Sequence, residues 1–132
     1  MDINQMRSNL SMRYLYFSQC SFTHKREIVD AELKMSLSSK MTQIEEHIYE
    51  VVLDFIASDG DQFDLQLTAN AEFEYVPASE DEDESLEKKL ISNNTIAIMF
   101  PFIRSQVSLL TTQPNLQPLI IPPINVKKFR AE

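Results

Sequence analysis

The sequence predicts an α+β domain: a four-stranded antiparallel sheet, a long C-terminal helix packed on one face, and a proline-rich extended tail. Three observations lead to this prediction. Apolar and polar residues alternate in four segments before Pro77, as they do in half-buried strands. Apolar residues then recur at steps of three and four between Asn94 and Leu110, which is typical of a helix face. Four prolines interrupt the apolar stretch from Pro114 to Val126.

The chain of 132 residues has the size of one domain, so we expect a single domain over 1–132 with loosely ordered ends at 1–9 and 127–132. Cys20 is the only cysteine, which excludes a disulfide within the chain and fits a reducing cytoplasm. We find no signal-peptide pattern and no apolar run long enough for a membrane span. The sequence therefore predicts a cytoplasmic protein.

Charge and glycine content exclude several classes of function. Acidic residues outnumber basic residues by 20 to 12, and the net charge of -8 repels nucleic acid. Gly60 is the only glycine, so no glycine-rich loop can hold a phosphate group. His24 and His47 lack the spacing of metal ligands. We therefore predict no enzyme activity, no cofactor and no metal.

The first two strands are expected around 10–22 and 29–37. Large residues occupy even positions from Leu10, and the alternation breaks between Leu15 and Phe17, where we expect a bulge. The polar residues 23–27 suit a connection. From residue 29 to 37 apolar and polar residues alternate strictly, which predicts a half-buried strand.

The third and fourth strands are expected at 47–57 and 63–75. A polar link at 38–43 precedes the third strand, which begins at His47 and has one apolar and one mixed face. Asp59-Gly60 between the two strands is a strong hairpin signal. Short connections predict antiparallel pairing, and Pro77 ends the last strand because it cannot donate to the ladder.

Beyond Pro77 we expect a mobile acidic loop at 77–85, a short helix around 85–91, and then the long helix. Residues 92–95 are of types that cap a helix start. The long helix has two apolar lines, one of them formed by Ile96, Phe100, Ile103, Val107 and Leu110, the other by Met99, Phe102 and Leu109. Pro101 lies in the first turn of this helix or at a kink within it. So wide an apolar surface needs a second neighbour besides the sheet.

The tail cannot form a regular element, because its prolines at 114, 118, 122 and 123 lack the backbone donor. It is nevertheless strongly apolar between Leu116 and Val126. We expect an extended ribbon that lies across the surface and borders a groove.

Two motifs resemble the SecB family of protein-export chaperones. The helix contains Ile98-Met99-Phe100-Pro101-Phe102-Ile103-Arg104, where the family has an apolar pair followed by Phe-Pro-Tyr-Ala-Arg-Glu. The tail contains Leu119-Ile120-Ile121-Pro122-Pro123-Ile124-Asn125-Val126, where the family has a leucine-rich run ending Pro-(Val/Ile)-Asn-Phe. The resemblance covers the layout from about Leu10 to Phe129.

This chain departs from the family pattern at several points. Phe102 replaces tyrosine, Ile103 replaces alanine, Ser105 replaces the acidic residue, and Val126 replaces the final aromatic residue. The segment after Val126 is too short for the second long helix of the family. The apolar character is kept, while the acidic patches that bind the SecA motor cannot be matched position by position.

The resemblance implies an ATP-independent holdase, usually a dimer of dimers, which binds unfolded or precursor polypeptides in apolar grooves and can engage SecA. Exposed aromatic residues and six methionines would suit such adaptable binding. Two alternatives stay open: a SecB-like chaperone dedicated to one client, such as an antitoxin of a toxin–antitoxin system, and an oligomeric adaptor that is not a chaperone.

Candidate site residues follow from these patterns, with ordinary core packing as the alternative for each. The predicted client groove is lined by Phe73, Tyr75, Phe100, Phe102, Leu116, Leu119 and Ile121. The predicted oligomer interface is formed by Ile96, Met99, Ile103, Val107 and Leu110.

Overall fold

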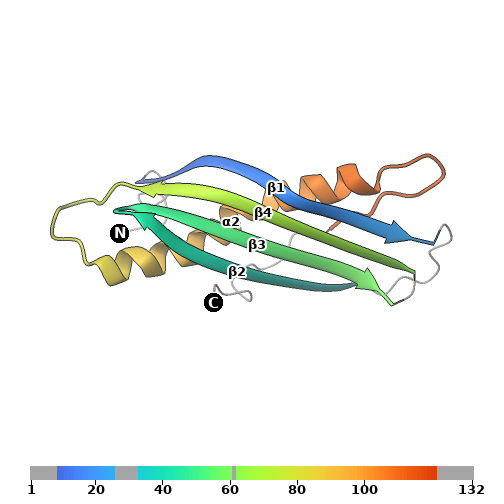
Figure 1. Ribbon diagram of the computed structural model, residues 1–132, viewed down its shortest axis with the longest axis horizontal. Helices are drawn as coiled ribbons and strands as arrows, with labels where there is room; N and C mark the ends of the chain where they lie inside the picture. The colour runs from blue at the N-terminus through green and yellow to red at the C-terminus, as the bar shows by residue number, and fades with distance from the viewer. Residues whose placement is uncertain (1–8, 26–32, 61, 122–132) are drawn as a thin grey trace.

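The computed structural model describes residues 9–25, 33–60 and 62–121, which form a four-stranded sheet and a long helix (Figure 1). The strands are β1 (Leu10–His24), β2 (Lys34–Glu45), β3 (Ile48–Asp59) and β4 (Phe63–Tyr75), and the helix is α2 (Glu84–Thr111). All neighbouring strands are antiparallel, so the predicted α+β class is confirmed.

The strand order is β1-β4-β3-β2, which the sequence left undetermined. The strands β2, β3 and β4 follow one another as neighbours, whereas β1 pairs with β4, with Leu10 opposite Tyr75 and His24 opposite Phe63. β1 and β2 are therefore the two edges of the sheet.

The polar segment 38–43, predicted to be a link, belongs to β2. Ser38 lies opposite Asp54 and Gln43 lies opposite Tyr49. Because an edge strand needs apolar residues on only one face at most, its polar composition does not prevent pairing. The strand reverses at His47, which has a φ of 64° and lies in the turn rather than in β3 as predicted. The predicted strand residues 29–32 lie outside the described residues.

Two irregularities in β1 explain its broken alternation. The register shifts between Met12 and Tyr14 and again between Phe17 and Gln19. The second shift adjoins the predicted bulge, and the first was not predicted. Each shift changes which side chains point toward the helix, so that large apolar residues keep facing the core along the strand. The strand also continues to His24, beyond the predicted end.

The core lies between the sheet and α2, which contacts β1, β3 and β4 and crosses behind the sheet in Figure 1. Fully buried residues alternate along β3 and β4 from Tyr49 to Ala57 and from Phe63 to Tyr75. The helix covers only this face. On the opposite face Tyr14, Tyr16 and Ile56 are exposed.

The predicted short helix and long helix are one continuous helix of 28 residues. Asp83 caps it by accepting a hydrogen bond from the Ser85 amide. The polar run 92–95 does not start a second helix: Ser92 Oγ donates to the Lys89 carbonyl at 3.1 Å, and Asn94 Nδ2 donates to the Leu90 carbonyl at 2.7 Å. These polar groups are satisfied within the helix, so the helix continues across them.

Pro101 lies inside α2, which decides the question that the sequence left open. Its ring is exposed. A proline at this position cannot donate to the carbonyl of Ala97, so the helix lacks one hydrogen bond in its interior.

Candidate functional site

The tail turns back along α2 after the helix ends. Asn115, with a φ of 63°, lies in the turn, and the Leu116 amide donates to the Gln113 carbonyl at 3.3 Å. The chain then passes Thr111 at residue 119 and Arg104 at residue 121. The described tail is thus extended and antiparallel to the helix, and Figure 1 shows it doubling back at the end of α2. Residues 122–126 of the predicted ribbon lie outside the described residues.

The seven groove candidates occupy three different environments. Phe73, Tyr75, Phe100 and Ile121 are buried, Leu116 and Leu119 are partly buried, and Phe102 is 45% exposed. The ring of Phe100 packs edge-on against Phe55, with a centroid distance of 6.1 Å. The structure therefore brings Leu119 and Ile121 to the helix and leaves Phe102 open to solvent. Their role in a client groove stays a prediction.

The interface candidates lie mostly in the core of this chain. Ile96, Met99, Ile103 and Val107 are buried, and Leu110 is partly buried. The second apolar line of the helix divides: Met99 joins the core, whereas Phe102 and Leu109 remain 45% and 70% exposed. The predicted surplus apolar surface is thus carried by Phe102 and Leu109. The oligomer interface itself stays a prediction.

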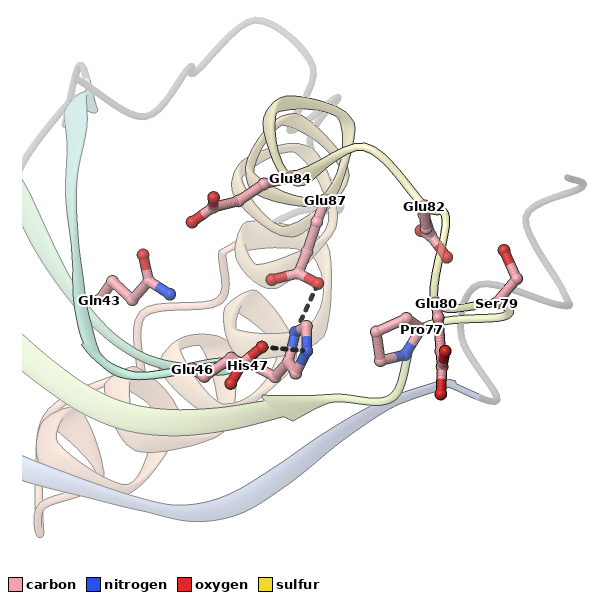
Figure 2. A pocket seen from close by; sticks show the side chains of 9 residues that line it. All are labelled: Gln43, Glu46, His47, Pro77, Ser79, Glu80, Glu82, Glu84 and Glu87. Carbon is pink, nitrogen blue, oxygen red and sulfur yellow. Dashed lines mark hydrogen bonds and ion pairs between the residues drawn. The ribbon is translucent and has the colours of Figure 1, made fainter.

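A cluster of glutamates at the start of α2 joins the helix to the sheet (Figure 2). Glu87 is 3% exposed and binds both the Tyr49 hydroxyl and His47 Nδ1, the latter at 2.7 Å. His47 Nε2 lies 3.5 Å from Glu46 Oε1. A cleft of about 910 Å³ opens beside this cluster, and its lining consists of Gln43, Glu46, His47, Pro77, Ser79, Glu80, Glu82, Glu84 and Glu87.

Two tyrosine hydroxyls donate to carboxylates in this region. Burial, and then the hydrogen bond to Glu87, raise the pKa of Tyr49. Burial and the hydrogen bond to Glu82 likewise raise the pKa of Tyr75. Glu82 also accepts the Ala78 amide at 2.8 Å. Both phenols therefore remain neutral donors and act as anchors rather than as bases.

Sequence reasoning missed this cluster, although one signal was present. Glu87, Ile91 and Thr95 follow one another at steps of four, and all three are buried on the face of α2 that meets the sheet. A carboxylate on that stripe needs a partner, which the tyrosine opposite supplies. Because acidic residues precede Glu87 in the sequence, nothing in the local composition distinguishes this buried glutamate from its exposed neighbours.

Two further side chains that could carry chemistry, His24 and Cys20, form hydrogen bonds with glutamines. His24 Nε2 lies 3.3 Å from Gln113 Oε1, and Gln106 Nε2 lies 3.7 Å from Cys20 Sγ. Among residues 9–25, 33–60 and 62–121, no three metal-ligating side chains come together. In the same described ranges, no helix has the length and apolar character that crossing a bilayer requires. The apolar surface of α2 and its tail is the candidate site.

The fold and this surface define an α+β protein with one open apolar helix face. The sequence profile of the SecB family, described as preprotein translocase subunit SecB, matches residues 4–131. The chain therefore belongs to the SecB family, as its two motifs predicted.

A solved structure of a SecB-like chaperone shows the same fold. A SecB-like chaperone of Mycobacterium tuberculosis, in complex with a ChAD peptide from the HigA1 antitoxin, matches 92% of this chain and 92% of that chain, with a TM-score of 0.72 and 12% identity. A protein of unknown function from Streptococcus agalactiae matches 86% of this chain and 96% of that chain, with a TM-score of 0.49 and 9% identity.

A curated relative matches a short segment. An uncharacterised protein of Methanocaldococcus jannaschii is 45% identical over 38 residues, which make up 29% of this chain and 24% of that protein. The match thus spans about a quarter of that relative's length.

Proposed function

We propose that this protein is an ATP-independent chaperone that holds non-native polypeptides on the apolar surface of α2 and its returning tail. Membership in the SecB family is the observation that carries this proposal. The exposed side chains of Phe102 and Leu109 support it, because a holdase needs apolar surface that clients can reach. The net charge of -8 would keep such a surface soluble. The proposed activity involves no catalytic step and no cofactor, and its setting is the cytoplasm.

The proposal extends to assembly and export. A second copy of the chain would cover part of the outward apolar face of α2, giving a dimer or a dimer of dimers. Light scattering of the purified protein tests this directly, since a monomer at micromolar concentration would contradict it. The description of the matching family as a translocase subunit supports the SecA motor as a partner.

A chaperone dedicated to one client is the second candidate function. The structural match that favours it is the mycobacterial SecB-like chaperone, which was solved with a peptide from an antitoxin. The two candidate functions differ in the range of clients that the protein binds. A general holdase binds several unrelated unfolded proteins with similar affinity, whereas a dedicated chaperone prefers one partner, encoded nearby, by a large factor.

Binding of an unfolded polypeptide tests the proposal. Fluorescence anisotropy with a labelled, reduced and alkylated protein that cannot fold should show saturable binding without nucleotide. Added ATP should leave the dissociation constant unchanged. Absence of binding by both this polypeptide and a second, unrelated one would contradict a general holdase, and nearby partners would then be tested individually.

A further inference from the structure

Two side chains of α2 hold the backbone of the returning tail. Thr111 Oγ1 accepts a hydrogen bond from the Leu119 amide at 2.9 Å, and Arg104 Nε donates to the Ile121 carbonyl at 3.1 Å. Arg104 and Thr111 are seven residues apart, which places them on one face, two turns and about 10 Å apart. Three extended residues span a similar distance, about 10 Å. The spacing of Arg104 and Thr111 along the helix thus matches the length of three extended residues.

The hydroxyl of Thr111 is oriented to accept. Its proton is donated to the Val107 carbonyl at 2.9 Å, so a lone pair remains for the incoming amide. Thr111 is 1% exposed, which shields this contact from water. Arg104 and Thr111 therefore bind one backbone C=O and one backbone N–H, and neither of these two contacts depends on the side chain of the bound residue.

The side chains of the tail alternate as in a strand. Ile121 is 1% exposed, Ile120 is 75% exposed, and Leu119 is partly buried against the core. Two apolar side chains thus point to the protein, and the residue between them points to solvent. The site accordingly accepts an apolar residue, any residue, and a second apolar residue.

Few contacts bind residues 117–121 of the tail to the rest of the protein. The described contacts are two side-chain hydrogen bonds, one fully buried side chain and one that is partly buried. These must offset the entropy of ordering the extended residues 117–121. The short connection between α2 and the tail compensates for this entropy cost, because it gives the tail an effective concentration in roughly the millimolar range. A free segment displaces the tail when its own contacts outweigh this effective concentration.

We propose that residues 119–121 are an internal pseudo-client. They occupy a site for extended apolar-x-apolar segments of clients, formed by Arg104, Thr111 and the apolar positions beneath Leu119 and Ile121. The tail limits access until a client segment replaces it. This inference rests on the proposed holdase function and adds the class of segment and the residues that bind it.

The site restricts which residues a bound segment can have at each position. The first apolar residue must supply an N–H, so a proline or an N-methylated residue is excluded there. The residue before it supplies no contact and can be proline, as Pro118 is in the tail.

The test uses a labelled, capped hexapeptide with the sequence of residues 116–121 and the full-length protein. The Leu119→Ala/Ile121→Ala variant, in which the tail is released, should bind this peptide about tenfold more tightly than the unsubstituted protein, since freeing an occupied site raises its apparent affinity. Ile120→Ala is the matched control: it makes the same type of change on the exposed residue, and the affinity should not change.

The backbone contacts are tested in the released variant. Arg104→Gln and Thr111→Val should each weaken peptide binding by about fivefold to tenfold, the effect of one lost hydrogen bond. A peptide N-methylated at the residue that corresponds to Leu119 should lose a similar factor in affinity. Thr111→Val should not weaken the binding of this N-methylated peptide any further, because both changes remove the same hydrogen bond.

Hydrogen exchange gives a measurement without tail variants. Exchange of the Leu119 amide should accelerate when the unsubstituted protein is saturated with an unfolded client, and unchanged or slower exchange would overturn the inference. Peptide binding no tighter in a folded released variant would also overturn it. If the unsubstituted protein binds an unfolded client while the peptide finds no site, the pseudo-client fails and the holdase stands. If no form binds any client, both fail.

Discussion

Glu87 is the residue at which helix and sheet are most directly joined. Its carboxylate is buried and binds one hydroxyl from β3 and one imidazole from the turn before it. A buried carboxylate is costly without such partners, so the contacts fix where α2 begins on the sheet. This contact and the buried apolar residues from Ile91 to Val107 together position the helix on the sheet.

Alkaline pH should weaken the fold through Tyr49. Burial raises its pKa above the ordinary 10.0, so the native protein holds this proton more tightly than the unfolded chain. The stability this contributes is fully present below pH 10 and is lost as the pH rises through the higher folded value. The free energy of unfolding should fall by up to about 1.4 kcal/mol per pH unit above pH 10 for such a group.

Urea unfolding at pH 9 to 11 measures this slope. Tyr49→Phe should reduce it and leave the part that Tyr75 contributes, at a cost in stability near neutral pH for the lost hydrogen bond. Tyr16→Phe, on the uncovered face of the sheet, is the matched control. Equal flattening in both variants would contradict the assignment to Tyr49.

Phe100 and Phe102 should respond differently to replacement by serine. Phe100 is 4% exposed and packs against Phe55, so Phe100→Ser should lower the free energy of unfolding by about 3 to 5 kcal/mol. Phe102 is 45% exposed, so Phe102→Ser should change it by about 0.5 kcal/mol or less. Denaturant unfolding measures both.

Phe102→Ser also separates a holdase from an adaptor. A holdase variant should lose affinity for an unfolded polypeptide while its assembly state, measured by light scattering, is kept. Lost assembly with no client binding in the parent protein would favour the adaptor.

At the scale of elements, α2 shows what local patterns can and cannot predict. The stripe from Ile96 to Leu110 predicted the helix and its buried face. The residue types of the polar run 92–95 suit caps and predict a helix start, yet the side chains of Ser92 and Asn94 donate to carbonyls of the preceding turn. Burial of Ile91 and Thr95 on the sheet favours continuation, and this tertiary contact is invisible in the local sequence.

Replacement of Pro101 should stabilise the helix. Pro101→Ala restores a donor for the Ala97 carbonyl at an exposed position, so the free energy of unfolding should rise by about 1 to 3 kcal/mol. Denaturant midpoints measure the change, with Ser105→Ala on the exposed surface as control. A loss of stability would show that the fold requires the backbone shape that proline imposes here.

The strands were predicted well where both faces had distinct character. The segment 63–75 was assigned with its final bounds, because its alternation is uninterrupted. The largest error concerns the edge strand β2, where pairing with β3 overrides polar composition. The candidate site was predicted only in outline: the return of the tail depends on contacts of Arg104 and Thr111 that no periodicity encodes.

At the scale of the whole molecule, the sheet and helix form one core, and residues 9–25, 33–60 and 62–121 by themselves leave open the outward face of α2 and one face of the sheet. The apolar part of the helix face is exposed through Phe102 and Leu109. Such a surface can be covered by assembly, by the tail of the chain or by a client. The holdase proposal assigns a role to all three.

Suppression of aggregation is the decisive measurement for the proposed holdase activity. A chemically unfolded protein is diluted into buffer without ATP, and its light scattering is followed with and without a several-fold molar excess of this protein. A holdase should suppress the scattering strongly, ATP should not alter this effect, and Phe102→Ser should weaken it. Scattering that rises equally with and without the protein would contradict it.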